Sequence, residues 1–322
     1  MVTGASGFLG RPLVAALLAQ GRPVAALCRN PESLADLRHP GLRVAAGDLR
    51  DSAAWAPLLP PGGSVFHLAG VRNQPRARIR DMEEVNVAAT LALARAAGER
   101  GVARFVHVAT ALIYGPAEGG RARTEADDLD RSSSYVRSKA EAVLGLRALA
   151  REGLPAVTVC PSIVFGPDHP SHPNRVTSEI RRLLRGGPRV WLAGGRQVRD
   201  LVFVDDVVGG LLAAEERGAV GEEYILGGEE VSPRELSRRV GGGRDLSGWT
   251  LSLPAGAALG IAGIVDRLRR HDAGAGYATA VRNLLREWRF SSCKARRDLG
   301  YQPRPLAEGL ARTIDWLATH EG

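Results

Sequence analysis

The sequence predicts an α/β fold in which a doubly wound parallel sheet is joined to a smaller, mostly helical lobe. Three observations lead to this prediction. Strand-like and helix-like segments alternate through the first half, a glycine-rich turn opens the chain, and the alternation loosens after about Gly166. Such alternation is typical of a parallel sheet covered by helices on both faces. We therefore expect one unit at residues 1–166 and a second at 167–322, with some later segments returning to the first.

The glycine turn follows a very short first strand. Residues 2–10 read Val-Thr-Gly-Ala-Ser-Gly-Phe-Leu-Gly, and an apolar helix pattern continues to Gly21. Gly4 permits a tight turn, Gly7 a close approach to a pyrophosphate, and Gly10 close packing of helix on sheet. A helix N-terminus also offers free N–H groups and partial positive charge to phosphates. The turn therefore predicts a Rossmann-type dinucleotide site formed by Gly4, Ser6, Gly7, Phe8, Leu9 and Gly10.

Only three residues precede Gly4, whereas a central parallel strand usually has about five. Either the first strand is short or residues are missing upstream, and we expect the second. Further strands are expected at 23–28, 42–46, 64–68, 104–109 and 155–160, with helices near 31–37, 52–59, 83–100 and 134–152. The carboxyl ends of parallel strands form the ligand-binding edge of such a sheet. That edge should include Gly4, Asp48, Ala69, Thr110 and Pro161.

Tyr135 and Lys139 are the most informative pair outside the turn. Only two of the 43 Lys and Arg residues are lysines, and one follows a tyrosine by four positions. With five tyrosines in 322 residues, chance gives this spacing roughly 0.03 times. On a helix the ammonium can lie beside the phenol and lower its pKa from about 10, which makes the phenol usable in proton transfer at neutral pH. The alternative is an ordinary surface pair.

The end of the second strand indicates which dinucleotide is bound. NAD-binding proteins place an acidic residue there for the ribose 2′-hydroxyl, but this chain has Arg29 and Asn30. Arg29 can pair bidentately with a 2′-phosphate. NADP(H) is therefore favoured over NAD(H).

Several other short segments occur in a characteristic order. They are Gly-Asp-Leu at 47–49, His-Leu-Ala-Gly at 67–70, Asn86-Val87 with Thr90, Val-Ala-Thr at 108–110, Ile-Tyr-Gly-Pro at 113–116, Pro-Ser-Ile-Val-Phe-Gly-Pro at 161–167 and Arg-Asp-Leu-Val-Phe-Val-Asp-Asp-Val at 199–207. With the glycine turn and the Tyr/Lys pair, they resemble the extended short-chain dehydrogenase/reductase family, the NAD(P)-dependent epimerase/dehydratase group, over essentially the whole chain. The segment 290–303 resembles the branch with dihydroflavonol-reductase-like and hopanoid-associated sugar-epimerase-like members.

The resemblance implies roles for individual residues. Thr110 would hydrogen-bond the substrate oxygen, Tyr135 would transfer its proton, and Lys139 would bind the nicotinamide ribose. Cofactor contacts are also implied for Asp48, Leu49, Leu68, Ala69, Gly70, Pro161 and Ile163. For Asp48 a helix-capping role before Asp51 is the rival interpretation.

The resemblance also narrows the reaction. Dehydratases of the group place Asp-Glu after the catalytic Thr, where this chain has Ala111-Leu112. We therefore expect either reduction of a small ketone or aldehyde, or epimerisation of a nucleotide sugar through a keto intermediate. A non-catalytic NADP-binding sensor or assembly factor is the alternative. Asn174 and Arg199 would contact an anionic substrate, although Cys160 replaces the Arg usual before the following Pro.

Composition limits the other possible partners. The net charge is +8, but the arginines are scattered, aromatic residues make up 5%, and we find no nucleic-acid motif, so no nucleic-acid partner is expected. Three widely separated cysteines predict neither disulfides nor a Cys-x-x-C metal site, which suits the cytoplasm. Asp168, His169 and His172 resemble metal ligands, but the prolines between them indicate a loop facing the substrate, so no metal is expected.

Two expectations concern surfaces. The longest apolar stretch, 251–265, is too short to span a bilayer. It either covers the second lobe or, followed by Arg267, lies against an anionic membrane surface. The resemblance also implies a homodimer formed through the helix that carries Tyr135.

Overall fold

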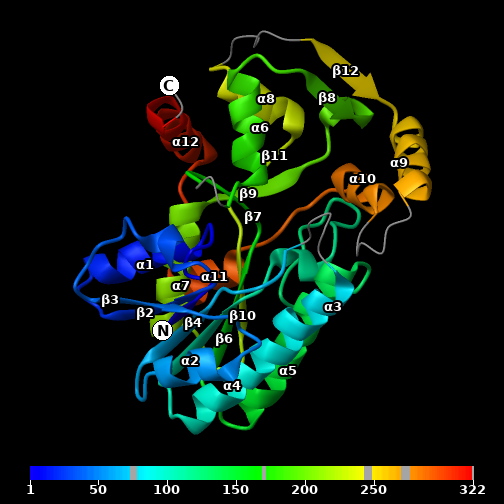
Figure 1. Ribbon diagram of the computed structural model, residues 1–322. Helices are drawn as coiled ribbons and strands as arrows, with labels where there is room; N and C mark the ends of the chain where they lie inside the picture. Colours follow the sequence, from blue (N-terminus) through cyan, green and yellow to red (C-terminus); the bar gives the residue numbers. More distant parts are fainter. Residues whose placement is uncertain (73–77, 169–171, 243–248, 270–275, 321–322) are drawn as a thin grey trace.

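The computed structural model describes residues 1–72, 78–168, 172–242, 249–269 and 276–320. A seven-stranded parallel sheet forms its centre (Figure 1). From one edge to the other, the strands are β10 (Glu223–Leu226), β6 (Ala156–Pro161), β5 (Arg104–Val108), β4 (Ser64–His67), β1 (Val2–Thr3), β2 (Val24–Cys28) and β3 (Leu42–Ala46). The chain builds outward from β1 to β3 and then returns to build β4 to β6 on the other side. The switch point between β1 and β4 is where ligands bind in such sheets.

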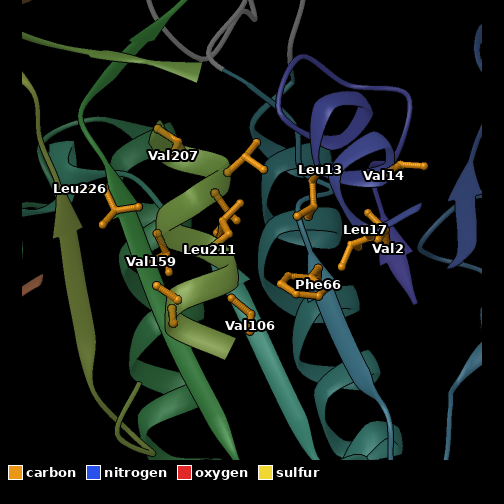
Figure 2. Packing of buried hydrophobic residues seen from close by; sticks show 14 of the residues in the cluster. Val2, Leu13, Val14, Leu17, Phe66, Val106, Val159, Val207, Leu211 and Leu226 are labelled. Atoms are coloured by element: carbon orange, nitrogen blue, oxygen red, sulfur yellow. The ribbon is translucent and has the colours of Figure 1, made fainter. Parts of the chain in front are cut away.

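Helices cover both faces of this sheet, as the alternating pattern predicts. One face carries α1 (Gly10–Ala19), α7 (Val204–Arg217) and α11 (Cys293–Leu299). Figure 2 shows Leu13 and Leu17 of α1 beside Val2 and Phe66, with Leu211 of α7 over the other half of the sheet. The other face carries α2 (Ser52–Trp55), α4 (Thr90–Glu99) and α5 (Ser134–Arg151). The predicted α/β fold class is confirmed.

The second region is built on two small sheets. The first contains β7 (Ile163–Phe165), β9 (Arg199–Phe203) and β11 (Glu229–Val231), and the second contains β8 (Arg189–Leu192) and β12 (Thr250–Leu253). The helices here are α6 (Arg175–Leu184), α8 (Pro233–Val240), α9 (Ala255–Arg269), α10 (Tyr277–Leu285) and α12 (Leu306–His320). β10, α7 and α11 lie on the large sheet although they follow residue 166. The division at 166/167 stays a prediction.

Local structure departs from the expected elements where helices are irregular. The helix expected at 83–100 is preceded by α3 (Ile79–Met82) and begins with a π-helical segment, η3 (Glu83–Ala89). The Thr90 hydroxyl donates to the Val85 carbonyl oxygen at 3.2 Å, five residues back, which matches the wider π turn. The expected helix 31–37 is only a 3₁₀ turn, η1 (Pro31–Leu34), and 52–59 divides into α2 and η2 (Ala56–Leu58). Other 3₁₀ turns are η4 (Ala111–Tyr114) and η5 (Ala193–Gly195).

Candidate active site

The glycine turn packs tightly against the end of β4. Gly4 has a φ of 65°, and a β-carbon there would lie 2.7 Å from the backbone nitrogen of Ala69. A β-carbon on Gly10 would overlap the carbonyl oxygen of Gly4. The positive φ and these close contacts exclude side chains at both positions. The turn therefore holds the start of α1 directly over the switch point.

The start of α1 suits an anion. Its N-cap residue, Leu9, offers no side-chain hydrogen bond, and its first turn contains no acidic residue. Gly7 closes the turn by donating to the carbonyl oxygen of Gly4 at 2.9 Å. In the first turn of α1 the Arg11 nitrogen donates to the Gly7 carbonyl oxygen at 3.0 Å and Pro12 has no N–H. An anion would therefore be held by the glycine turn and by the partial positive charge of the helix end, flanked by half-buried Ser6 and Phe8. These residues fit the pyrophosphate of a dinucleotide.

Residues 68–70 connect the glycine turn to Lys139. The Ala69 nitrogen donates to Thr3 Oγ1 at 3.3 Å, while Gly4 packs against Leu68 and Ala69. A β-carbon on the next residue, Gly70, would lie 3.3 Å from Lys139 Nζ. The Lys139 ammonium and the glycine turn therefore contact adjacent residues of one short segment.

Lys139 is buried at the end of β5. Its Nζ donates to the Val108 carbonyl oxygen at 2.9 Å, and its side chain is only 6% exposed. Burial lowers the pKa of Lys139 to about 8. Among the described residues no carboxylate forms an ion pair with it. An ammonium with an acceptor on one side and no counter-ion is suited to hold polar groups of a ligand.

Tyr135 lies one turn before Lys139 on α5, and Ser133 caps this helix by accepting from the Val136 nitrogen at 3.3 Å. Burial raises the pKa of Tyr135 to about 12, and nearby Arg72 offsets this only in part. The expected lowering of this pKa by Lys139 is therefore wrong. The reason is geometric, because the ammonium turns to the Val108 carbonyl rather than to the phenol.

Thr110 completes the predicted trio. It caps η4, its Oγ1 accepts from the Leu112 nitrogen at a long 3.4 Å, and it is 7% exposed. Its neighbours Ala109 and Ala111 belong to the buried cluster against which Tyr135 packs. Thr110 thus follows the end of β5, Lys139 contacts the last residue of that strand, and Tyr135 lies one turn earlier on the helix of Lys139.

Asn86 is a site residue to which the sequence analysis assigned no role. Its Oδ1 accepts from the Val71 nitrogen at 2.7 Å, and its Nδ2 donates to Val71 O and Ser138 Oγ, both at 3.0 Å. A β-carbon on Gly70 would also lie 3.0 Å from Asn86 Oδ1. Asn86 therefore fixes the segment after β4 against α5. The Asn86-Val87 motif could have indicated this residue. The π-helical segment that orients its side chain could not be predicted from the sequence.

Charged residues also follow β2 and β3, the two strands on the other side of β1 from β4. Arg29 is exposed at the end of β2. Arg50 binds Asp48 with two hydrogen bonds of 2.9 Å, and these hydrogen bonds lower the pKa of Asp48 to about 2, with a smaller contribution from Arg29. The helix cap is Asp51, which accepts from the Ala53 nitrogen. The capping role considered for Asp48 is therefore wrong, and Asp48 and buried Leu49 lie at the same sheet edge as Arg29.

The remaining predicted cofactor contacts lie after β5 in the chain. Pro161 ends β6 and pairs with Leu226 of β10, and half-buried Ile163 begins β7. Between them, Ser162 donates to Asp200 Oδ1 at 2.6 Å. Burial raises the pKa of Asp200 to about 6. Pro161 thus occupies the predicted ligand edge, and Asp200 ties this edge to β9.

The second region contains a cavity of about 210 Å³. Its lining includes Arg175, Arg182, Arg199 and Trp191. Arg199 binds Glu179 through both terminal nitrogens at 3.2 and 3.4 Å, while its buried Nε has no hydrogen-bond partner among the described residues. The cavity therefore combines a tryptophan with three guanidinium groups and one carboxylate, Glu179, and the excess of positive charge suits an anionic ligand.

The structure separates the two predicted substrate residues. Asn174 does not line this cavity. It caps α6 by accepting from the Val176 nitrogen at 2.9 Å, and it donates to the Val164 carbonyl oxygen at 2.9 Å. The amide of Asn174 is thus already bonded within the protein, whereas Arg199 lines the cavity. A substrate role for either residue stays a prediction.

The described residues contain no cluster of His, Cys, Asp and Glu that could hold a metal ion. Asp168 accepts from the Asn174 nitrogen at 2.7 Å and binds Arg181 at 2.9 Å, and His169 lies outside the described residues. The same part of the chain contains no helix long and apolar enough to cross a bilayer.

These features define a class of protein, a dinucleotide-binding oxidoreductase with a lysine and a tyrosine at the switch point of a parallel sheet. The family model described as the NAD dependent epimerase/dehydratase family matches residues 1–227. The chain belongs to this family, so it is an NAD(P)-dependent enzyme of the epimerase/dehydratase type.

Three similar proteins cover nearly the whole chain. A dTDP-glucose 4,6-dehydratase of Streptomyces griseus is 35% identical, over 99% of this chain and 94% of the relative. A UDP-glucose 4-epimerase of Mycolicibacterium smegmatis is 29% identical, over 98% and 97%. The structure of DesIV, a dTDP-glucose 4,6-dehydratase from Streptomyces venezuelae with NAD and TYD bound, is 30% identical, has a TM-score of 0.78 and covers 100% of this chain and 97% of its own.

Proposed function

We propose that this protein catalyses epimerisation of a nucleotide sugar through a transient ketone, with Thr110, Tyr135 and Lys139 at the reacting carbon. The observation that carries the proposal is the contact of both Lys139 and the glycine turn with the segment that follows β4. This arrangement would place the reactive end of a bound dinucleotide beside the Tyr135 helix. A dinucleotide held there would supply the acceptor and donor of hydride for the reacting carbon.

Each residue of the trio would have its own task. The Thr110 hydroxyl would hydrogen-bond the substrate oxygen, since its bond to the Leu112 nitrogen is long and weak. Tyr135 would exchange the proton of that oxygen. Lys139 would hold the nicotinamide ribose and, when it turns from Val108 toward the phenol, favour the phenolate. Holding both reactants in place supplies much of the rate acceleration.

The choice of a nucleotide sugar is supported by the cavity in the second region. Arg175, Arg182 and Arg199 line it, and guanidinium groups match the geometry of a diphosphate. The curated epimerase and dehydratase relatives are named for UDP-glucose and dTDP-glucose. Replacing Arg199 with Gln should raise the KM for the nucleotide sugar at least about tenfold while kcat changes less. Arg234→Gln on the exposed face of α8 is the matched control, with no change expected.

Dehydration is not proposed, despite the similarity to dehydratases. Elimination needs an additional acid/base pair, and the two positions after Thr110 are apolar. Ala111 is fully buried, and Leu112 packs against the same apolar cluster as Tyr135. Neither side chain can carry a proton.

The proposed function is tested with purified protein and a panel of UDP- and dTDP-hexoses. Inversion at one carbon without net change in cofactor absorbance, followed by NMR, is the expected result. Sugars that neither bind nor react would contradict it. Turnover of the wild-type and Tyr135→Phe proteins separates this outcome from a non-catalytic NADP sensor, because an enzyme loses inversion with the hydroxyl whereas a sensor binds cofactor and inverts no sugar in either form.

Net reduction of a ketone or aldehyde by NADPH is the second candidate. This candidate is favoured by Arg29, which we propose to bind a 2′-phosphate. It also agrees with the resemblance of segment 290–303 to the branch with dihydroflavonol-reductase-like members. Arg29→Gln should lower the affinity for NADPH about tenfold or more and that for NADH little. Exposed Arg43→Gln on β3 is the control. Equal loss for both cofactors would remove the support for NADP(H).

We also propose a homodimer formed through the layer of α4 and α5. Mass measurement in solution tests this, and a monomer at micromolar concentration would refute it.

A further inference from the structure

The helix α9 exposes apolar side chains to solvent. Ile261, Ile264 and Leu268 are 55%, 58% and 78% exposed. Their spacing of three and four residues places them on one face, while Ala258 and Ala262 of the other face are buried. In the described residues this apolar face of α9 is uncovered. Large exposed apolar surface on a folded protein is a sign of an interaction site.

The exposed apolar surface continues onto the adjoining two-stranded sheet. Val190 of β8 pairs with Leu251 of β12, and each is 42% exposed. Trp249, which precedes β12, is 63% exposed. Figure 1 shows β12 leading directly into α9 at the periphery of the second region, far from the large sheet. We call Val190, Trp249, Leu251, Ile261, Ile264 and Leu268 the apolar edge.

The apolar edge adjoins the cavity of the second region. Val190 belongs to the apolar edge and also lines the cavity, next to Trp191. Whatever covers this edge therefore lies beside the cavity.

The charge around the apolar edge is positive. Exposed Arg267 lies in the last turn of α9. Exposed Arg182 of α6 donates to the carbonyl oxygen of Pro188, the residue before β8. Asp266 is bonded to the backbone nitrogens of Tyr277 and Ala278, which leaves it less available to offset these charges. A second copy would bring like charges together, whereas an anionic surface would complement them.

We propose that the apolar edge docks on the surface of an anionic lipid bilayer. The face with Ile261, Ile264 and Leu268 would lie in the interfacial plane, Trp249 would lie at the level of the headgroups, and Arg267 would pair with lipid phosphates. Docking would place the cavity beside the membrane surface. This inference goes beyond the proposed function and does not depend on it.

The test uses the full-length protein and vesicles of phosphatidylcholine with or without about 30% phosphatidylglycerol, a composition that separates charge from apolar insertion. Co-sedimentation with the anionic vesicles is expected, with weaker binding to neutral vesicles and at high salt. Replacing Ile261, Ile264 and Leu268 together with Ser should reduce partitioning at least about tenfold. Arg267→Gln should reduce it roughly fivefold. Val220→Ser, at a 49% exposed valine outside the edge, is the control and should bind normally.

Trp249 provides a second readout that does not depend on sedimentation. Its fluorescence should shift to shorter wavelength with anionic vesicles, and Trp249→Phe should remove that shift. Circular dichroism and cofactor binding verify that the triple variant is folded. Absence of binding to any vesicle, equal binding to neutral and anionic vesicles, or unchanged binding by the triple variant would overturn the proposal. Conversion of a dimer to a monomer by the triple variant would also overturn it, because the occupant would then be a second copy.

Discussion

Lys139 and Gly70 approach each other so closely that a β-carbon on Gly70 would lie 3.3 Å from the lysine ammonium nitrogen. The same β-carbon would lie 3.0 Å from Asn86 Oδ1. The side chains of Lys139 and Asn86 therefore both lie against Gly70, which has no side chain. Gly70 directly follows Ala69, the residue that contacts the glycine turn.

Gly70→Ala should therefore disturb the site more than the fold. The added methyl group would move Lys139 or Asn86 by a few tenths of an ångström, and such displacements reduce catalysis. We expect kcat/KM to fall about tenfold. Because Gly70 is exposed, the free energy of unfolding should change by less than about 0.5 kcal/mol. Steady-state kinetics and urea unfolding measure the two effects, and full activity in a folded variant would be incompatible with this geometry.

Gly10→Ala should damage both stability and cofactor binding. Its methyl group would overlap the backbone of the glycine turn, and we expect a loss of at least about 2 kcal/mol in the free energy of unfolding. Dinucleotide affinity, measured by calorimetry, should fall with it. Gly209→Ala is the control, because Gly209 is an exposed residue of α7 with no neighbour within 4 Å of a β-carbon. That variant should be more stable by up to about 1 kcal/mol.

The pH dependence of activity should report Lys139. Its pKa is lowered to about 8, so the ammonium form predominates below pH 8 and is lost as pH rises through that value. We expect kcat/KM, which reflects the free enzyme, to decline above about pH 8. Lys139→Arg should lower activity but remove this decline, since a guanidinium stays charged. The control is Lys294→Arg at the second lysine, and an unchanged profile in Lys139→Arg would assign the titration to another group.

Acid should destabilise the protein through His67. This buried imidazole bonds Thr3 Oγ1 at 2.7 Å and Thr90 Oγ1 at 2.8 Å, and burial lowers its pKa to about 3. Between pH 6.5 and 3 the unfolded chain binds a proton that the folded chain does not, so this contribution to stability is present above 6.5 and is lost as pH falls. From pH 7 to 5 the loss should be about 2 kcal/mol. His67→Gln should reduce the dependence but leave the part due to His107, whose pKa burial also lowers, whereas exposed His39→Gln should leave it unchanged.

The elements near the glycine turn could be predicted because their signals are local. Ser133 caps α5, Gly4 adopts a positive φ, and the polar ends of the strands follow apolar runs. Periodicity and turn chemistry within a few residues were enough to place Thr110 at the predicted ligand edge and Tyr135 and Lys139 on one helix face, whereas the grouping of the three residues was implied by the family resemblance.

Interactions between distant residues could not be predicted. Tyr114 donates to Glu223 Oε2 at 2.7 Å across 109 positions, and Arg147 binds the same carboxylate. The pKa of Tyr135 was misjudged for the same reason, because a spacing of four residues fixes the helix face but does not reveal the Val108 carbonyl that attracts Lys139. Such contacts depend on how strands pair, and no short sequence window contains that information.

The most direct test of the account is the turnover of the Tyr135→Phe protein loaded with cofactor. Loss of a positioned acid/base should lower kcat by about 10²–10⁴-fold, while cofactor affinity, measured by calorimetry, stays within about twofold. Tyr224→Phe, which removes a hydroxyl that accepts from the Ala219 nitrogen away from the site, should retain activity. Turnover of Tyr135→Phe at the wild-type rate would contradict the central claim that this phenol transfers the substrate proton.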